Sequence, residues 1–337
     1  MQRTFVDATM TIFSDKKYFT HKRAAMCALI AAYLVCGCNS VHAEDNDNQS
    51  YEFANIINPR VPDAMYICGQ KVDLQNVDYY ERLDRELTSL AYTHGTTLLI
   101  LKRANRYFPQ MAPILRSNGV PDDLLYLACV ESSLDTRAYS PAKAAGIWQF
   151  IPATAKEYGL EISDEVDERL NIDKSTAAAC RYFKKALARY NGDWLSVFAS
   201  YNTGMGRVTK ELETQAASSA AELWLSKETM RYPFRIIAIK AILESPADYG
   251  FVITADQLYQ PREVKIVEVN GPVESWVDWA AQYGISYREL RDENPWIQAK
   301  QLTNRAGKTY RVRVPLRESL KRSSERVSVY NHAWIGK

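Results

Sequence analysis

The sequence has few histidines and no excess of charge of one sign. Its 337 residues include only 4 histidines, and no Cys/His cluster has the spacing of a metal site. We therefore expect neither a metal nor a cofactor. The formal net charge is +2, from 42 basic and 40 acidic side chains, which favours no nucleic-acid partner and no strongly cationic surface.

Cysteines are also few. Beyond the first 38 residues only Cys68, Cys129 and Cys180 remain, and an odd number argues against a disulfide framework. Cys129 and Cys180 both fall in predicted helices, where they could pair or pack. We favour packing, because cysteine behaves as a small hydrophobic side chain.

Long apolar runs are missing except near the N-terminus. Basic residues at positions 16, 17, 22 and 23 precede the run AAMCALIAAYLVCGC, which ends at Cys38. The run is short for a bilayer span and predicts an export signal. Because the basic part begins late, Met10 could be the true start.

Two processing routes fit this signal. Residues 35–38, VCGC, resemble a bacterial lipobox, which favours lipidation at Cys38. Cleavage after Ala43, in the small-residue sequence VHA, is the alternative. We expect an exported protein at the periplasmic face of a bacterial membrane, with the outer membrane and a lipid anchor favoured.

Changes in pattern divide the chain into five segments. They are the signal, lipobox and tether (1–43), a helical extension without assignable chemistry (44–106), an all-α domain (107–250), a β-α-α-β domain (261–316) and a charged tail (317–337). The predicted fold class is mainly α, since the helical segment of about 140 residues has the usual size of one domain. The tail lacks a pattern, and we expect it to be loosely held.

Capping residues locate several helices of the all-α domain. Asn171 and Asp193 can each cap a helix, because their side chains accept hydrogen bonds from the first backbone N–H groups. Pro152 can open a short helix that Gly159 closes. Pro233 is expected to open the last apolar helix, of residues 234–243.

The stretch of residues 121–152 contains a carboxylate among the apolar residues of a predicted helix. Pro121 suits the first position of a helix in which Leu124 and Leu127 form an apolar stripe, and Glu131 lies within that stripe. Desolvation raises the pKa of a carboxyl group, and a protonated acid can protonate the leaving oxygen of a sugar–sugar bond. Alternatively, the helix ends near Glu131 and its carboxylate reaches water.

Three other segments of the all-α domain contain polar side chains among apolar residues. They are Gln149 within GIWQFIP (146–152), Tyr201 and Asn202 within SYNTG (200–204), and Tyr232, just outside the helix that Pro233 would open. Each has a structural interpretation when taken alone: a satisfied loop amide, a helix C-terminal turn and a packing residue.

The order and spacing of these segments resemble a known family. Glu131-Ser132, GIWQFIP, SYNTG and Tyr232 resemble the four motifs of family 1 lytic transglycosylases, the soluble-lytic-transglycosylase-like members of the lysozyme-like superfamily. Trp148 and the following PATAKEYGL look most like the membrane-bound lytic murein transglycosylase D subgroup. The resemblance covers about residues 107–249. Ser200 and Met205 depart from the usual Ala and Glu, and Trp148 from the methionine of many relatives.

The resemblance implies a role for each matching residue. Glu131 would be the single catalytic acid that protonates the MurNAc–GlcNAc oxygen and then, as a base, lets the muramyl 6-hydroxyl close a 1,6-anhydro ring. Ser132 would position that acid or the substrate, and Tyr201 would hydrogen-bond Glu131. The remaining three, expected to contact sugar in the groove, are Gln149, Asn202 and Tyr232.

The residues themselves leave other functions open. Most glycosidases use two carboxylates, and Asp135 would share the face of Glu131 if the helix continued. We expect the helix to end first, at Ser132-Ser133, and Glu157 and Glu161 have polar surroundings. A hydrolytic muramidase using Asp135, a non-catalytic wall-binding protein and a metal-dependent hydrolase of stem peptides remain as alternatives.

The C-terminal unit, residues 263–315, resembles a LysM peptidoglycan-binding module. Its helical segment VESWVDWAAQYGIS, Leu290, Asn294-Pro295 and the closing strand match. The usual Gly-Asp-Thr-Leu turn is absent, and residues 270–273, NGPV, stand in its place. The resemblance implies peptidoglycan glycan strands as the partner, and a small packing domain without sugar affinity is the alternative.

Overall fold

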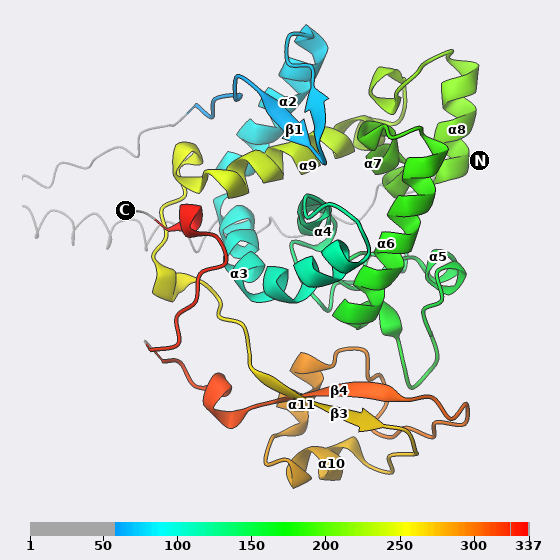
Figure 1. Cartoon of the computed structure of the whole chain (residues 1–337), viewed down its shortest axis with the longest axis vertical. Coiled ribbons are helices and arrows are strands. Elements are labelled where there is room, and N and C mark those ends of the chain that lie inside the picture. Colours follow the sequence, from blue (N-terminus) through cyan, green and yellow to red (C-terminus); the bar gives the residue numbers. More distant parts are fainter. Residues whose placement is uncertain (1–57, 324, 336–337) are drawn as a thin grey trace, which may run out of the picture. The chain divides into compact units, whose positions relative to one another are not determined.

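The computed structural model describes residues 58–323 and 325–335, and these residues are mainly helical (Figure 1). The expected signal, the start at Met10, the lipidation at Cys38 and the cleavage after Ala43 all lie outside the described residues. Within the described ranges, we find no helix with the length and apolar character needed to span a bilayer.

The helical part starts with a small hairpin and continues through eight α-helices. The hairpin pairs β1 (Met65–Ile67) with β2 (Gln70–Val72). The helices are α2 (Val77–Tyr92), α3 (His94–Ser117), α4 (Leu124–Ser132), α5 (Pro152–Glu157), α6 (Ile172–Arg189), α7 (Trp194–Thr203), α8 (Met205–Thr214) and α9 (Lys227–Glu244). Short 3-10 helices, η1 (Glu168–Leu170) and η2 (Ala220–Glu222), lie between them.

Helix α9 lies at the centre of this part and packs against α2, α4 and α7 (Figure 1). Its sequence is apolar almost all round, and residues Phe234 to Leu243 are largely buried, as expected of a helix covered on several sides. One hydrophobic core joins α2 to α9. The boundary expected between residues 106 and 107 falls inside α3, so residues 58–106 share this core.

The local capping predictions are confirmed. The Asn171 side chain accepts from the Lys174 N–H at the start of α6, and the Asp193 side chain accepts from two N–H groups at the start of α7. Pro152 occupies the first turn of α5, and Gly159, with φ of 77°, follows its end. These caps need only neighbouring residues, which is why the sequence specifies them.

The expected start of α4 is wrong by one turn. The helix begins at Leu124, and Pro121 lies in a preceding turn, where its carbonyl accepts from the Leu124 N–H. Asp123 is drawn away from capping because its carboxylate accepts from Lys240 of α9 at 2.7 Å and from the Cys68 N–H at 2.6 Å. Asp123 therefore makes no side-chain capping hydrogen bond at the start of α4.

The expected start of α9 is also wrong. The helix begins at Lys227, capped by Ser226, and Pro233 lies inside it. Pro233 lacks the N–H that would bond the carbonyl of Thr229, but the helix continues through this position because its buried face packs on three neighbours. Tyr232 is consequently an internal helix residue and is buried.

A separate small core supports the C-terminal domain. Strand β3 (Val264–Val269) pairs antiparallel with β4 (Tyr310–Pro315), and α10 (Trp276–Gln282) and α11 (Tyr287–Glu293) lie between them in sequence. The predicted β-α-α-β order and the mainly α fold class are confirmed. Two further 3-10 helices, η3 (Pro246–Tyr249) and η4 (Ala255–Gln257), precede the domain, and η5 (Arg317–Leu320) and η6 (His332–Trp334) follow it.

The C-terminal residues pack closely, so the expectation of a loosely held tail is wrong. Trp334 is only 2% exposed, and its indole N–H donates to the Leu243 carbonyl at 2.6 Å. The rings of Trp334 and Tyr330 both contact Phe108 of α3. These contacts are long-range, and no local pattern in the charged tail signals them.

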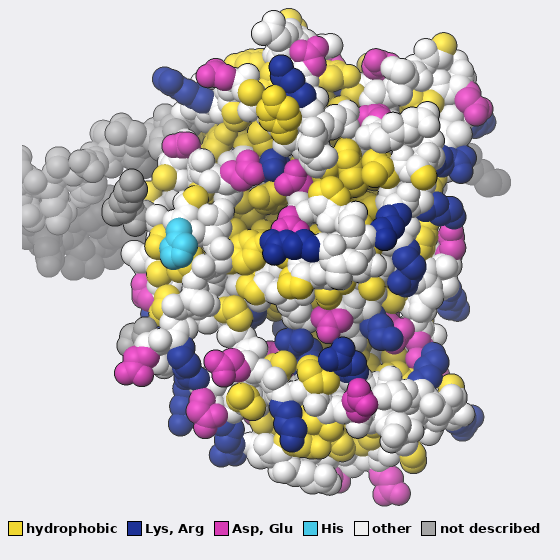
Figure 2. Space-filling model, viewed as in Figure 1, with side chains coloured by type: hydrophobic (Ala, Val, Ile, Leu, Met, Phe, Trp, Pro, Cys, Tyr) yellow, Lys and Arg dark blue, Asp and Glu magenta, His cyan; other side chains and the backbone are white. Residues whose placement is uncertain are grey.

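Cysteines and surface charge agree with the predictions. Cys68, Cys129 and Cys180 are free thiols, and the last two are buried as small packing residues. Figure 2 shows basic and acidic side chains interspersed over the face in view, in keeping with the net charge of +2.

Candidate active site

Glu131 lies one residue before the end of α4. The helix ends at Ser132, and Ser133 adopts a left-handed conformation with φ of 51°, which turns the chain away. Asp135 consequently leaves the face of Glu131; it lies 3.9 Å from Arg103 and accepts from the Arg137 N–H. The predicted helix end is confirmed, and it separates the two carboxylates.

The hydroxyl that hydrogen-bonds Glu131 belongs to Tyr232, which donates to its Oε1. The expected donor, Tyr201, instead donates to the Trp148 carbonyl at 2.7 Å, so that expectation is wrong. Tyr201 is held in this direction by stacking on Phe183, with 5.3 Å between ring centres. The sequence predicts Tyr232 outside α9 and in contact with sugar. Its hydrogen bond to Glu131 depends on its position inside α9, which packs against α4.

Burial makes Glu131 a weak acid. It raises the pKa of the Glu131 carboxyl to about 7, and the nearby Glu228 acts in the same direction. The hydrogen bond from Tyr232 and the charge of Arg235 oppose this rise without cancelling it. Glu131 therefore exchanges a proton near neutral pH, which is the property that general acid–base chemistry requires.

A buried carboxylate on α2, Glu86, holds two arginines that flank Tyr232 on α9. Glu86 is 1% exposed and accepts from Arg231 at 2.6 and 3.0 Å, and it lies 3.5 Å from Arg235. Burial acts to raise the pKa of Glu86, but the contacts with Arg231, Arg85 and Arg235 together outweigh it and keep that pKa below its usual value. Arg235 also pairs with Glu228 at 2.9 Å.

Sequence reasoning missed this network. The signal was present, because Glu86 lies between Leu83 and Leu87 on the buried face of α2. That is the same anomaly that drew attention to Glu131. The network matters here because it engages Arg235, the cation that acts on Glu131.

The loop of residues 146–152 is tied to the end of α4. The Ser132 hydroxyl donates to the Ile147 carbonyl at 2.9 Å and to Ala128 within its own helix. Gly146 has φ of 78°, and a Cβ there would lie 2.0 Å from the Arg169 carbonyl oxygen. The glycine therefore permits a close approach between the backbones of residues 146 and 169.

Gln149 and Asn202 each have half of their amide engaged. The Gln149 amide nitrogen donates to the carbonyls of Gly146 and Ala138, at 2.8 and 3.2 Å. The Asn202 oxygen accepts from the Thr229 hydroxyl at 2.8 Å. Among residues 58–323 and 325–335, no partner engages the Gln149 amide oxygen, an acceptor, or the Asn202 amide nitrogen, a donor.

These residues surround a cleft of about 720 Å³. Of the predicted site residues, the cleft is lined by Glu131, Gln149, Tyr201 and Asn202. The other two support the site from behind: Ser132 through Ile147, and Tyr232 through Glu131. The cleft wall is polar in part, which suits a hydroxyl-rich ligand.

The cleft also contains charged residues that the sequence did not assign. Glu157 of α5 lines it and pairs with Lys185 of α6 at 2.8 Å, and Arg189 lies one turn further along α6. Glu161 lies 2.8 Å from Lys308 and accepts from Tyr310 of the C-terminal domain. Both acids have the polar surroundings that were expected.

In the part of the chain that the structure describes, no three His, Cys, Asp or Glu side chains gather as a group that could hold a metal ion.

Fold and cleft together define a class of protein with an all-α domain in which an acid lies at the end of a buried helix, beside a partly polar cleft. Comparison with known families identifies its type. Residues 111–224 match the family model of the transglycosylase SLT domain, and residues 265–318 match that of the soluble lytic transglycosylase C-terminal LysM-like domain. The chain therefore contains an SLT transglycosylase domain followed by a LysM-like domain.

Individual relatives agree with this assignment. The chain is 34% identical to the membrane-bound lytic murein transglycosylase D of Escherichia coli K12 over 251 residues, which are 71% of this chain and 53% of that protein. It is 34% identical to the peptidoglycan transglycosylase gp16 of Escherichia phage T7 over 34% of this chain and 9% of that protein. The chain thus spans about half the length of the E. coli relative.

Solved structures were also compared. The 70 kDa soluble lytic transglycosylase of E. coli aligns with a TM-score of 0.38 and 18% identity, over 51% of this chain and 33% of that one.

Proposed function

We propose that this protein is a lytic murein transglycosylase that cleaves the β-1,4 bond between MurNAc and GlcNAc and leaves a 1,6-anhydroMurNAc end. The observation that carries the proposal is the pKa of about 7 of Glu131, within the cleft of the matched SLT domain. Such a group is protonated often enough to act as an acid and, once ionised, can act as a base.

In the proposed reaction Glu131 acts twice. Its proton passes to the glycosidic oxygen as the bond from the anomeric carbon to that oxygen breaks, and GlcNAc leaves as an alcohol. The carboxylate then accepts the proton of the muramyl 6-hydroxyl, whose oxygen bonds to the anomeric carbon. Glu131 ends protonated, so no water is consumed and no second carboxylate is needed.

The other site residues would orient this chemistry. Tyr232 holds Oε1 of Glu131, which leaves Oε2 for the substrate. Gln149 would accept a hydrogen bond from sugar, and Asn202 would donate one, because the other half of each amide is already engaged. Ser132 positions the acid indirectly through the 146–152 loop, and Tyr201 shapes the cleft wall.

A hydrolytic muramidase is the second candidate, because Glu157 lines the same cleft. In that reaction a second carboxylate activates water or forms a covalent intermediate. The pairing of Glu157 with Lys185 disfavours such a role, since the ion pair already occupies the carboxylate.

Product analysis distinguishes the two. Purified sacculi are digested with the wild-type chain and with Glu131→Gln and Glu157→Gln, and the muropeptides are weighed by mass spectrometry. We expect anhydromuramic ends from wild type and Glu157→Gln, and a loss of about 10²–10⁴-fold for Glu131→Gln. Products heavier by one water would support the hydrolase, and equal activity of Glu131→Gln and wild type would exclude this role for Glu131.

The location follows from the same proposal. We propose that the protein is exported and lipidated at Cys38, which would hold it at the periplasmic face of the membrane next to its substrate, with cleavage after Ala43 as the alternative. We also propose that the LysM-like domain binds glycan strands. Membrane fractionation of wild type and Cys38→Ala tests the anchor: release of only the variant supports lipidation, and equal release supports cleavage.

A further inference from the structure

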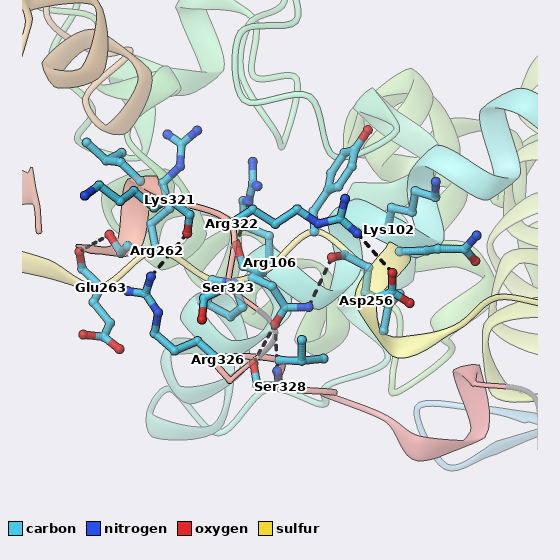
Figure 3. A pocket seen from close by; sticks show the side chains of 18 residues that line it. Lys102, Arg106, Asp256, Arg262, Glu263, Lys321, Arg322, Ser323, Arg326 and Ser328 are labelled. Carbon is cyan, nitrogen blue, oxygen red and sulfur yellow. Dashed lines mark hydrogen bonds and ion pairs between the residues drawn. The ribbon is translucent and has the colours of Figure 1, made fainter. Parts of the chain in front are cut away.

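A second and larger cavity, of about 1250 Å³, shares no lining residue with the cleft. Figure 3 shows this cavity from close by. Its walls come from α3, from the linker of residues 256–263 and from the C-terminal residues 319–323 and 326–328. Six of the lining side chains are cationic: Lys102, Arg106, Arg262, Lys321, Arg322 and Arg326. We call this the basic cavity.

The C-terminal wall of the basic cavity is anchored at both ends. At one end the Ser319 hydroxyl donates to the Glu263 carbonyl at 3.1 Å. At the other, the Ser328 N–H donates to Gln260 at 2.8 Å, and its carbonyl accepts from buried Asn105 at 3.0 Å. The cavity is therefore framed by specific contacts between distant parts of the chain.

Positive charge in the basic cavity is only partly compensated. Asp256 and Glu263 are its acidic lining residues, and Asp256 pairs with Arg322 at 3.0 Å, as Figure 3 shows. Arg262 pairs with Glu293, outside the cavity, at 2.9 Å.

The other four cations have no such partner. Arg106 donates to the Gln260 carbonyl and lies over the Tyr259 ring, and Arg326 donates to the Lys321 carbonyl. Neutral carbonyls do not cancel a charge. Among the described residues, no carboxylate lies within ion-pair distance of the four cations Lys102, Arg106, Lys321 and Arg326.

The shape of the cavity decides which anion suits it. A flat bilayer meets cations on one protruding face, whereas these cations surround a hollow between α3, the linker and the C-terminal segment, with Arg322 at its exposed edge. The volume exceeds that of most small-ligand pockets, which leaves room for a chain with several charges. Separate cations on α3 and on the C-terminal segment suit an extended ligand with two or more carboxylates.

We propose that the basic cavity binds an acidic peptide through two or more of its carboxylates. The murein stem peptide is a peptide of this kind, and naming it as the ligand rests on the proposed function. The basic cavity and the cleft share no lining residue. The stem peptide bound in the cavity would therefore anchor a glycan strand while Glu131 cleaves a glycosidic bond in the cleft.

Calorimetric titration of the full chain tests this proposal. The protein carries Glu131→Gln, so that cleavage cannot interfere, and the probe is the synthetic tripeptide L-Ala-γ-D-Glu-diaminopimelate. We expect binding that weakens as salt is raised and that is lost when the peptide carboxyls are amidated. Lys102→Gln with Lys321→Gln should weaken it about tenfold or more, since two charge contacts are removed. The control, Lys265→Gln at an exposed position of β3, should leave the binding unchanged.

Several outcomes would overturn the proposal. They are equal binding of the amidated peptide, no effect of the two cavity substitutions, or binding of tripolyphosphate or phosphatidylglycerol vesicles in place of the tripeptide. The catalytic assignment is judged separately, from products of the otherwise wild-type Lys102→Gln/Lys321→Gln chain on stem-free glycan, which should match those of the parent. Loss of tripeptide binding would therefore leave the catalytic role of Glu131 intact. Absence of cleavage products would likewise leave the proposed peptide binding in the basic cavity intact.

Discussion

Tyr232 of α9 donates a hydrogen bond to Glu131 of α4, and the two residues are 101 positions apart in the sequence. Burial raises the pKa of the Tyr232 hydroxyl, and the charge of Glu131 adds to this rise, so Tyr232 remains a donor. The acid is therefore oriented by a helix that also carries Arg231 and Arg235. Its protonation depends on how α9 is held.

Tyr232→Phe should separate orientation from protonation. The hydrogen bond from Tyr232 lowers the pKa of Glu131, so its loss should move the alkaline limb of activity to higher pH. Maximal activity on sacculi should fall about 10- to 100-fold, because the carboxyl is no longer held in place. A pH–rate profile measures both effects.

Tyr201→Phe is the matched control. It removes the hydrogen bond to the Trp148 carbonyl, and a buried unsatisfied acceptor costs about 1–3 kcal/mol of unfolding free energy. The alkaline limb should stay where it is. If Tyr201→Phe moved that limb and Tyr232→Phe did not, the assignment of the two hydroxyls would be reversed.

Glu131→Gln should change how stability depends on pH. The pKa of Glu131 is about 7 in the folded chain, against an ordinary value of 4.5 for a glutamate side chain. Between these values the folded state binds the extra proton, so wild-type stability should decrease as pH rises from 4.5 to 7 and then level off. The Glu131→Gln variant does not lose this stability, so its advantage over wild type should grow to roughly 3 kcal/mol at and above pH 7. Urea unfolding at several pH values checks this, and parallel curves would contradict it.

Glu86→Gln should destabilise the protein far more than loss of a surface ion pair. Without Glu86 the Arg231 guanidinium loses its buried partner, which costs about 3–5 kcal/mol. Asp78→Asn breaks the exposed pair with Arg82 and should cost less than about 1 kcal/mol. Denaturant titration compares the two, and similar losses would remove Glu86 from the account of the site.

Glu86→Gln should also lower the pKa of Glu131. The charge of Arg235 lowers the pKa of Glu131, and Glu86 partly neutralises that charge. The alkaline limb of activity should therefore move to lower pH, and Arg235→Gln added to Glu86→Gln should return it. No return in the double variant would show that Arg235 is not the cation responsible.

Gly146→Ala should damage both the fold and the cleft. Its φ of 78° disfavours a side chain, and the new Cβ would lie 2.0 Å from the backbone oxygen of Arg169. We expect a loss of at least about 3 kcal/mol and of cleft activity. Gly119→Ala, with φ of 66° and no atom within 4 Å of the new Cβ, should cost about 1–2 kcal/mol. Thermal melts of the two variants measure the difference, and equal losses would exclude the close approach as the cause.

Local chemistry explains what could be predicted. Asn171 and Asp193 cap helices through N–H groups two or three residues away, so their roles are visible in the sequence. The alternation of residues in β3 and β4 likewise specified the strands. Glu131 was found because it interrupts an apolar stripe on a helix, and that pattern is also local.

Long-range contacts explain what could not. Pro233 predicted a helix start, but burial of α9 on three sides carries the helix through it. The charged tail gave no sign that Trp334 reaches the carbonyl of Leu243. Both errors have one reason: the free energy comes from partners far away in the sequence.

The sequence by itself determined the mainly α class, the helix caps, the C-terminal β-α-α-β unit and the choice of Glu131, an acid that interrupts the apolar stripe of a helix. Only the tertiary structure decided which tyrosine holds Glu131, that Glu86 engages the arginines beside it, and that six cations meet in a second cavity. A cap or a stripe is set by neighbours along the chain, whereas a hydrogen bond between α4 and α9 depends on how two helices pack.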